Sequence, residues 1–337
     1  MVSTVARRKR DVIADFWDAL DDMGEYCDFY MGSYSTGMAE PEWTRFRHRE
    51  YDGTTAFAEF LRTKRNFAIN YDDFATSGTP PSKWALFVAW LRLYFLALRQ
   101  RPPMRWRRLD ASWRPVPTRR SPPPAFAWTL FSKEDTLRLE RLAQSHDVSL
   151  QAWLLWALKE TILPELVPGS GVVSWKVPLS MHGAFPSEGE LGVSSFSLDV
   201  TFPPEAGPEQ IHQAIRREMK LRRHWVVGVF TFKFAKWIPR WALRWFMRLA
   251  MWTRPWQGSF SASLAMDADS TSDLEEWFIG RGHVLRATPL GICCAEWRGR
   301  LSLSIQIHPA VSTDPQVARD WVATWRRFAE GEKEAAL

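Results

Sequence analysis

An Arg- and Pro-rich stretch, RQRPPMRWRRLDASWRPVPTRRSPPP, fills residues 99–124 of this 337-residue chain. Proline cannot donate a backbone hydrogen bond and has a fixed φ, so repeated prolines exclude a regular helix or strand there. Eight arginines face a single acid in the same stretch. We therefore expect a crossover at 99–125 that joins an N-terminal lobe at 1–98 to a C-terminal lobe at 126–337.

The region after the crossover combines helix starts with strand patterns. Ser132 and Ser149 are the expected N-caps of two helices, and Asp314 followed by Pro315 predicts the start of a last one. Strand-like segments, two of them with period-two alternation, lie at 172–180, 196–202 and 301–307. Helices and strands mix without a strict βαβ rhythm, which favours an α/β fold of the α+β sandwich type over a Rossmann sheet.

The net charge of the chain indicates which classes of partner it could bind. The chain has a formal net charge of +6 and a pI near 9.3, which favours phosphorylated ligands, anionic lipids or acidic carrier proteins. Nucleic acid fits poorly, because the sequence carries no recognised nucleic-acid-binding fold. The most apolar stretch, residues 84–98, is too short to span a bilayer and contains Arg92. The basic N-terminus lacks the apolar core of a signal peptide, so we expect a cytoplasmic protein.

The cysteines argue against structural cross-links. There are three of them, Cys27, Cys293 and Cys294. An odd number without metal-type spacing predicts neither a disulfide framework nor a metal site. Because the adjacent pair lies in an apolar, strand-like run, we expect buried free thiols.

A short motif carries the candidate chemistry. Residues 47–53, RHREYDG, follow an apolar-aromatic run and precede a helix-like segment. A histidine four residues before Asp-Gly is either an exposed polar turn or a catalytic base held by a turn. Neutral imidazole has an unperturbed pKa near 6.5, which suits proton transfer near neutral pH. Short motifs often match by chance, so the rest of the chain has to decide.

The ordered segments around this motif resemble the chloramphenicol acetyltransferase-like superfamily, which includes condensation domains of peptide synthetases, plant BAHD acyltransferases and bacterial wax ester synthases. The family motif HHxxxDG matches at His48, Asp52 and Gly53. KVPLSMHG followed by GELGVSSFSLDVTF resembles a strand pair of the family, and the segments from FIGRGHVLRATPLGICC onward resemble its last strands and helix. The resemblance implies a two-lobed fold with mixed sheets flanked by helices.

The same resemblance implies acyl transfer from a thioester to a hydroxyl or amine. His48 would be the general base and Asp52 a structural brace for the turn. Gly53 would allow backbone geometry or close packing that a Cβ would obstruct. Ser261 and Ser263 fall where the family places an oxyanion donor. No bound cofactor is implied, and the co-substrate would be an acyl-CoA or acyl-carrier-protein thioester.

Some positions depart from the family pattern. Arg47 replaces the first motif histidine and would lower the pKa of His48, keeping it neutral. His182 stands where the family has an arginine, so it is the other histidine of interest. Only 47 residues precede His48, which implies a shortened N-terminal lobe and leaves an inactive relative as an alternative.

A basic, Trp-rich segment follows at residues 225–256, which contain six basic and no acidic residues. Two neighbouring helical stripes with a spacing of four are formed by Lys236, Arg240, Arg244 and Arg248, and by Trp237, Trp241 and Trp245. Like charges at this spacing repel, so an anionic lipid surface, coenzyme A phosphates or an acidic carrier protein would relieve the repulsion. A basic helix with interfacial Trp suits a membrane surface best. The alternative is a solvated face whose tryptophans pack on the core.

Three hypotheses result. The leading one is an acyltransferase with a lipophilic acyl chain or acceptor, since 20 tryptophans suggest apolar tunnel walls. The competing one is a non-catalytic membrane- or carrier-binding relative of the same fold, peripheral at the inner membrane surface. The third is a condensation-type enzyme that forms an amide in a biosynthetic pathway.

Overall fold

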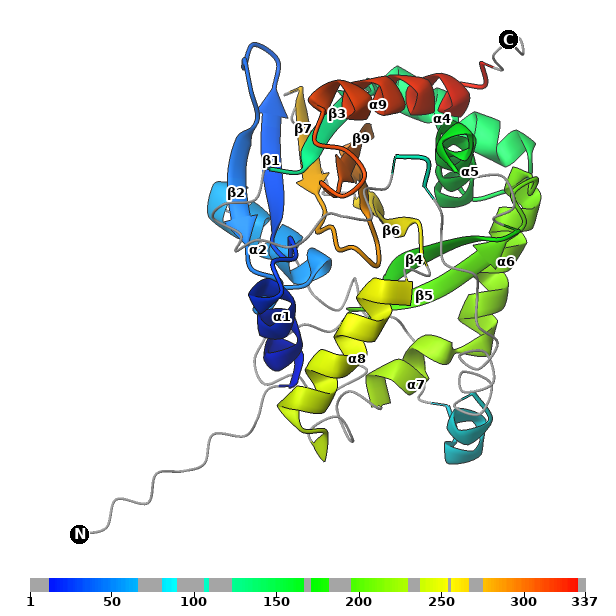
Figure 1. Ribbon diagram of the computed structural model, residues 1–337. Helices are drawn as coiled ribbons and strands as arrows, with labels where there is room; N and C mark the ends of the chain where they lie inside the picture. The colour runs from blue at the N-terminus through cyan, green and yellow to red at the C-terminus, as the bar shows by residue number, and fades with distance from the viewer. Residues whose placement is uncertain are drawn as a thin grey trace.

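The computed structural model describes residues 12–65, 81–89, 106–108, 123–166, 171–181, 195–229, 237–253, 256–266 and 275–332. Two sheets with helices around them make up the described part of the chain (Figure 1). The predicted α/β class with mixed sheets flanked by helices is confirmed. In this part of the chain no helix is long and apolar enough to cross a membrane.

The smaller sheet has three antiparallel strands in the order β2-β1-β7. These strands are β2 (Glu42–Phe46), β1 (Phe29–Ser35) and β7 (Glu276–Arg281). Helix α1 (Val12–Asp22) precedes β1, and α2 (Gly53–Arg65) follows β2. The core of this lobe is aromatic, with Phe29, Phe60 and Phe278 buried together.

The larger sheet has six strands in the order β3-β9-β8-β6-β4-β5. Their bounds are β3 (Ala125–Leu130), β9 (Arg300–Ile307), β8 (Leu290–Trp297), β6 (Gly258–Met266), β4 (Val173–Ser180) and β5 (Ser195–Phe202). Strand β6 runs parallel to both of its neighbours, whereas the other pairs are antiparallel. The sheet is therefore mixed.

Helices from both halves of the sequence surround this sheet. They are α4 (Lys133–Ser145), α5 (Leu150–Ile162), the short η2 (Leu163–Glu165), α6 (Pro208–Leu221), α7 (Arg223–Val229), α8 (Arg240–Thr253) and α9 (Pro315–Ala329). Helices α5, α6 and α9 pack on the sheet and form one continuous core with it. Residues 83–89 form a further helix that packs on α7 through Leu86.

The predicted helix starts are confirmed. The Ser132 hydroxyl accepts a hydrogen bond from the Asp135 N–H at 3.1 Å, so Ser132 caps α4. Ser149 caps α5 and Asp314 caps α9 in the same way. Each cap satisfies an N–H group that has no partner inside the helix.

Strand β9 is buried on both faces. Its alternation predicts that Leu301, Leu303, Ile305 and Ile307 lie inside, and all four are fully buried. The intervening polar residues are buried as well, because β7 lies on that face. The hydroxyls of Ser302 and Ser304 donate hydrogen bonds to the carbonyls of Phe278 and Gly280 in β7. These bonds satisfy polar groups that would otherwise be costly to bury.

Strand β7 therefore joins the two sheets. It pairs with β1 in the smaller sheet and packs across β8 and β9 of the larger one. The approach is close, since a Cβ on Gly291 of β8 would lie 2.7 Å from the His283 carbonyl oxygen. The domain limits at 98 and 126 remain a prediction, because most of the Arg/Pro-rich crossover lies outside the described residues.

We predict that Gly291→Ala lowers the free energy of unfolding by about 1–3 kcal/mol, since the added Cβ forces the backbone at His283 away from β8. Urea unfolding measures the change. Gly53→Ala is the matched control, because a Cβ there meets nothing within 4 Å. It should leave stability unchanged or raise it by up to about 1 kcal/mol. Equal losses in both variants would contradict the proposed close contact.

Candidate active site

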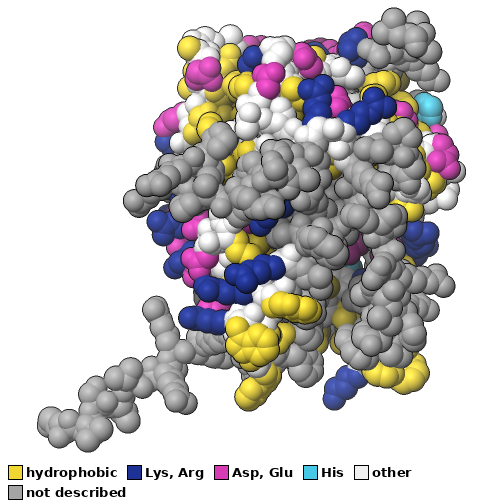
Figure 2. All heavy atoms as spheres, in the orientation of Figure 1, with side chains coloured by type: hydrophobic (Ala, Val, Ile, Leu, Met, Phe, Trp, Pro, Cys, Tyr) yellow, Lys and Arg dark blue, Asp and Glu magenta, His cyan; other side chains and the backbone are white. Residues whose placement is uncertain are grey.

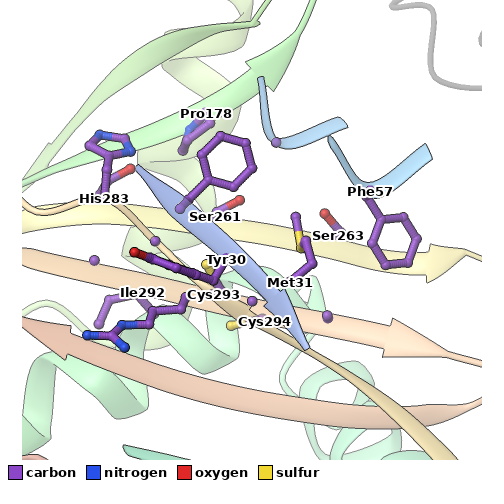
Figure 3. Close-up of a pocket in the computed structure, with 18 of the residues that line it drawn as sticks. Tyr30, Met31, Phe57, Pro178, Ser261, Ser263, His283, Ile292, Cys293 and Cys294 are labelled. Atoms are coloured by element: carbon purple, nitrogen blue, oxygen red, sulfur yellow. The ribbon is translucent and has the colours of Figure 1, made fainter. Parts of the chain in front are cut away.

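A pocket of about 90 Å³ lies where the smaller sheet faces β6 and β8 (Figure 3). Its walls come from the two lobes, and they include Phe29, Tyr30, Met31, His48, Gly53, Arg281 and His283 on one side and Ser259, Ser261, Ser263, Cys293 and Cys294 on the other. The fold thus brings His48, Gly53 and the two candidate serines to one cavity. In the sequence, His48 and Ser261 are more than 200 residues apart.

The period of β6 determines which side chains reach the pocket. Successive residues of a strand point to opposite faces. Phe260 and Ala262 pack into the core under the larger sheet, whereas Ser259, Ser261 and Ser263 line the pocket. Figure 3 shows Ser261 and Ser263 along β6, with β1 crossing in front. A row of hydroxyl donors therefore faces the lobe that carries His48.

Aromatic rings hold the His48 imidazole. Its ring stacks on Trp17 of α1 with centroids 3.8 Å apart and planes at 15°. Phe29 contacts it edge-on at 5.2 Å, and His283 does so at 4.8 Å. Nδ1 of His48 is buried and has no hydrogen-bond partner among the described residues. Contacts with these three rings position the imidazole.

Burial also sets the charge of the two imidazoles. It lowers the pKa of His48 to about 4, although the polar backbone at His48 and the carboxylates of Asp52 and Asp28 act in the opposite direction. Burial, together with the neighbouring His48, lowers the pKa of His283 to about 3. Both rings are neutral at pH 7. The expected direction for His48 is right, but the expected cause is wrong: Arg47 is exposed and lies 3.8 Å from Glu50.

Asp52 holds the turn between β2 and α2. It is fully buried, and its Oδ1 accepts hydrogen bonds from the N–H of Thr55 at 2.8 Å and from the Thr55 hydroxyl at 3.0 Å. This is the geometry of an N-cap, with Gly53 as the first residue of the helix. A brace role for Asp52 agrees with these contacts.

The expected reason for Gly53 is wrong. Its φ is not in the left-handed region, and a Cβ would meet no atom within 4 Å. Neither backbone strain nor packing requires glycine here. Gly53 lines the pocket instead, so its missing side chain leaves space open beside His48.

The pocket cysteines are unreactive. Cys27, Cys293 and Cys294 are free thiols, as the sequence predicts for the adjacent pair. Burial raises the pKa of Cys293 to about 12. Because the thiolate is the reactive form, Cys293 is not a nucleophile at neutral pH.

Two site residues are missed by sequence reasoning, Trp17 and His283. His283 follows β7 and reaches the pocket only because β7 crosses to the smaller sheet. Trp17 belongs to an amphipathic helix that carries no motif. His182, the histidine that the family comparison singles out, lies outside the described residues.

Arg281 of β7 adds a fixed cation to the pocket wall. Its guanidinium donates to the side-chain oxygen of Gln306 and lies 5.4 Å from the Tyr30 ring centroid. Burial lowers the pKa of Arg281 from its usual value, but guanidinium stays charged in proteins. The pocket therefore has a positive potential on the β7 side.

The predicted basic stripe is only partly free for an anionic ligand. Lys236 lies outside the described residues. Arg240 pairs with Asp15 of α1 at 2.6 Å, and Arg244 pairs with Asp22. Arg248 is exposed. Acids of α1 thus relieve the repulsion that the sequence pattern assigned to an external partner.

Solved structures share this fold. The nonribosomal peptide synthetase FmoA3 matches with a TM-score of 0.53 at 15% identity, over 88% of this chain and 31% of that one. The EpoB cyclization-docking bidomain from Sorangium cellulosum matches with 0.52 at 14% identity, over 86% and 61%. The epimerization domain from the third module of tyrocidine synthetase B matches with 0.50 at 14% identity, over 86% and 68%.

This chain therefore has the chloramphenicol acetyltransferase-like fold of condensation-type domains, as the sequence resemblance implied. At such low identity the likeness concerns the fold alone. The chain spans about a third of the FmoA3 synthetase. No family model matches the sequence, and no curated protein matches it.

We predict that the free energy of unfolding falls as the pH drops from about 6.5 to about 4. The unfolded imidazoles take up protons in this window, whereas the folded His48 and His283 stay neutral. Urea midpoints at several pH values measure the slope. A His48→Gln/His283→Gln variant should show a flatter profile, and an unchanged slope would contradict the lowered pKa values.

Proposed function

We propose that this chain is an acyltransferase that moves an acyl group from a thioester to a hydroxyl or amine, with His48 as the general base. The observation that carries the proposal is that one and the same pocket is lined by His48 from one lobe and by the β6 serines from the other. Acyl transfer needs a base and an oxyanion donor on opposite sides of a carbonyl. The fold shared with condensation-type domains supports the reaction class.

The base step follows from the ring geometry. Burial of Nδ1 leaves Nε2 as the nitrogen that an acceptor can reach. Nε2 takes the proton of the acceptor hydroxyl or amine while the acceptor attacks the thioester carbonyl carbon. When the tetrahedral intermediate collapses, the C–S bond breaks and the thiolate takes the proton from Nε2. The products are the ester or amide and a free thiol, and His48 is neutral again.

Negative charge on the carbonyl oxygen needs a donor at the moment of attack. We assign this role to a β6 hydroxyl, Ser261 or Ser263, since both line the pocket. A hydroxyl rotates freely and can donate to an oxyanion without a change in the backbone. The positive charge of Arg281 on the same wall favours the anionic intermediate further.

Asp52 serves the base in two ways in this mechanism. It caps α2 and fixes the turn after His48. Its carboxylate also raises the pKa of His48 against the effect of burial. Formation of an imidazolium in a desolvated pocket is costly, and a buried negative charge nearby lowers that cost.

The thioester donor is best assigned to a carrier protein. The solved structures of this fold belong to peptide synthetases and related assembly systems, whereas acyl-CoA remains the second donor to test. The pocket of about 90 Å³ is smaller than the 300–1,000 Å³ of ordinary ligand sites. It holds the reacting groups, so the acyl chain and the acceptor extend beyond it. An amide-forming reaction uses the same groups with an amine acceptor.

We predict that His48→Ala lowers turnover by about 10²–10⁴, the usual contribution of a general base. The assay measures free thiol released from acyl-carrier-protein or acyl-CoA donors in the presence of alcohols or amines. His146→Ala is the matched control, because His146 is an exposed histidine at the end of α4. Full turnover in the His48 variant would overturn the mechanism. Absence of turnover with every donor would favour the non-catalytic relative.

We further predict that kcat/KM is constant between pH 6 and 8 and falls only below about pH 5, because the lowered pKa keeps the base neutral down to about pH 4. Asp52→Asn removes the charge but keeps an N-cap. It should move the acidic limb of the profile to still lower pH, since Asp52 raises the pKa of His48. An acidic limb near pH 6.5 would show that the imidazole is solvated.

A further inference from the structure

The most exposed aromatic residues of the described chain are tryptophans. Trp237 is 77% exposed, Trp241 73% and Trp245 59%, and Trp84 is 72% exposed. The alternative in which the tryptophans of the 237–245 stripe pack on the core is therefore wrong. Trp carries a large apolar area, and leaving it in water is unfavourable. Exposed apolar groups that gather in one place mark an interaction surface.

The tryptophans gather at one end of the molecule. Trp241 and Trp245 lie four residues apart on α8, whereas Trp237, which the sequence pattern placed on the same helix, precedes its start at Arg240. The Trp84 and Phe87 rings lie 5.6 Å apart, tilted by 32°, on the helix of residues 83–89, which packs on α7. Figure 1 places α7 and α8 together at the lower end, and Figure 2 shows hydrophobic side chains at that edge. We call these five aromatic residues the aromatic end.

The opposite face of α8 explains why the tryptophans point outward. Leu243 and Met247 are also four residues apart, and they pack with Phe16 and Leu20 of α1. Met247 is 4% exposed. A helix cannot bury both faces on one neighbour. Because α1 covers the aliphatic face, the indole rings of α8 remain on the outside.

The segments that carry the aromatic end are basic, although α1 beside α8 carries acids. The described residues 81–89, 223–229 and 237–253 contain no Asp or Glu, and their basic residues are Lys83, Arg223, Arg240, Arg244 and Arg248. Three of these arginines have acidic partners: Arg240 pairs with Asp15, Arg244 with Asp22, and Arg223 with the buried Glu218. Lys83 and Arg248 have no ion pair within the described residues. Figure 2 shows Lys and Arg side chains beside the hydrophobic ones at this edge.

We propose that the aromatic end docks on an anionic phospholipid bilayer. Indole rings prefer the interface between lipid headgroups and acyl chains, and arginines beside them meet lipid phosphates. The aromatic end has two separate parts, the tryptophans of 237–245 and the Trp84–Phe87 pair. Two such projections fit a deformable lipid surface better than a rigid protein surface, which would need a complementary cavity for each. The contact is peripheral: rings enter the interface and no helix crosses it. It is independent of the chemistry proposed at His48.

Flotation with vesicles tests the docking. The full chain is mixed with phosphatidylcholine vesicles with or without phosphatidylglycerol and centrifuged through a density gradient. We expect flotation with the anionic vesicles, and a loss of binding of about tenfold or more in Trp237→Ser/Trp241→Ser/Trp245→Ser, as three rings stop burying apolar area. Arg248→Gln should weaken binding about fivefold, the contribution of one cation near an anionic surface.

Matched controls lie at the far end of the molecule. Leu137→Ser removes an exposed hydrophobic side chain on α4, and Arg319→Gln removes a cation on α9. Both should float like the wild type. His48→Ala should float normally too, which separates this test from the test of acyl transfer.

Four results would overturn the proposal. The wild type could stay unbound with anionic vesicles at low salt, or the triple Trp variant could float as well as the wild type. Light scattering could instead show a dimer that the triple variant abolishes, and the aromatic end would then bind a second copy of the chain. Capture of an acidic carrier protein by the aromatic end, without flotation, would assign the surface to that partner.

Discussion

The contact between β7 and the larger sheet is the constraint on which the site depends. Two glycines allow this close approach, because a Cβ on Gly280 would lie 2.8 Å from the Cys293 side chain and one on Gly291 would lie 2.7 Å from the His283 carbonyl oxygen. The hydroxyls of Ser302 and Ser304 then bond the β7 carbonyls across the gap. One six-residue strand thus belongs to one sheet by pairing and to the other by packing. The pocket opens where this strand ends, so its shape depends on the closeness of that contact.

Local features of the fold could be predicted from the sequence, since they depend on neighbours in the chain. Ser132, Ser149 and Asp314 cap helices by hydrogen bonds that span two or three residues, and such bonds leave a readable pattern. The place of β7 leaves no such pattern. Its residues pair with Tyr30 to Ser35, about 240 positions earlier, and nothing in EWFIGR indicates that partner. The partner of a strand that crosses between two sheets therefore becomes known only from the structure.

The residues of the candidate site fall into the same two groups: those that a local sequence pattern predicts and those that only the fold brings together. His48 and Asp52 could be named because their motif is local, and the β6 serines because their segment falls where the family resemblance implies an oxyanion donor. Trp17 and His283 could not, because their contacts with His48 are ring stacking between distant segments. The pKa of His48 shows the same limit of sequence reasoning. The neighbouring Arg47 suggests the right direction of the pKa shift, but burial among rings from distant segments is its cause. A packing argument about Gly53 failed because the space beside it belongs to the pocket and not to a neighbouring element.

Helices α8 and α1 connect the aromatic end to His48. Helix α8 presents its tryptophans outward and packs Leu243 and Met247 against α1, and α1 carries Trp17, which stacks on His48. The Arg244–Asp22 pair between these helices is exposed and worth little, whereas Arg240 pairs with the mostly buried Asp15 beside the buried aliphatic contact. Apolar packing and one indole ring thus form the chain of contacts between α8 and His48. Trp17 stacks on the imidazole beside Phe29 and His283, so the packing of α1 against its neighbours contributes to the position of the base.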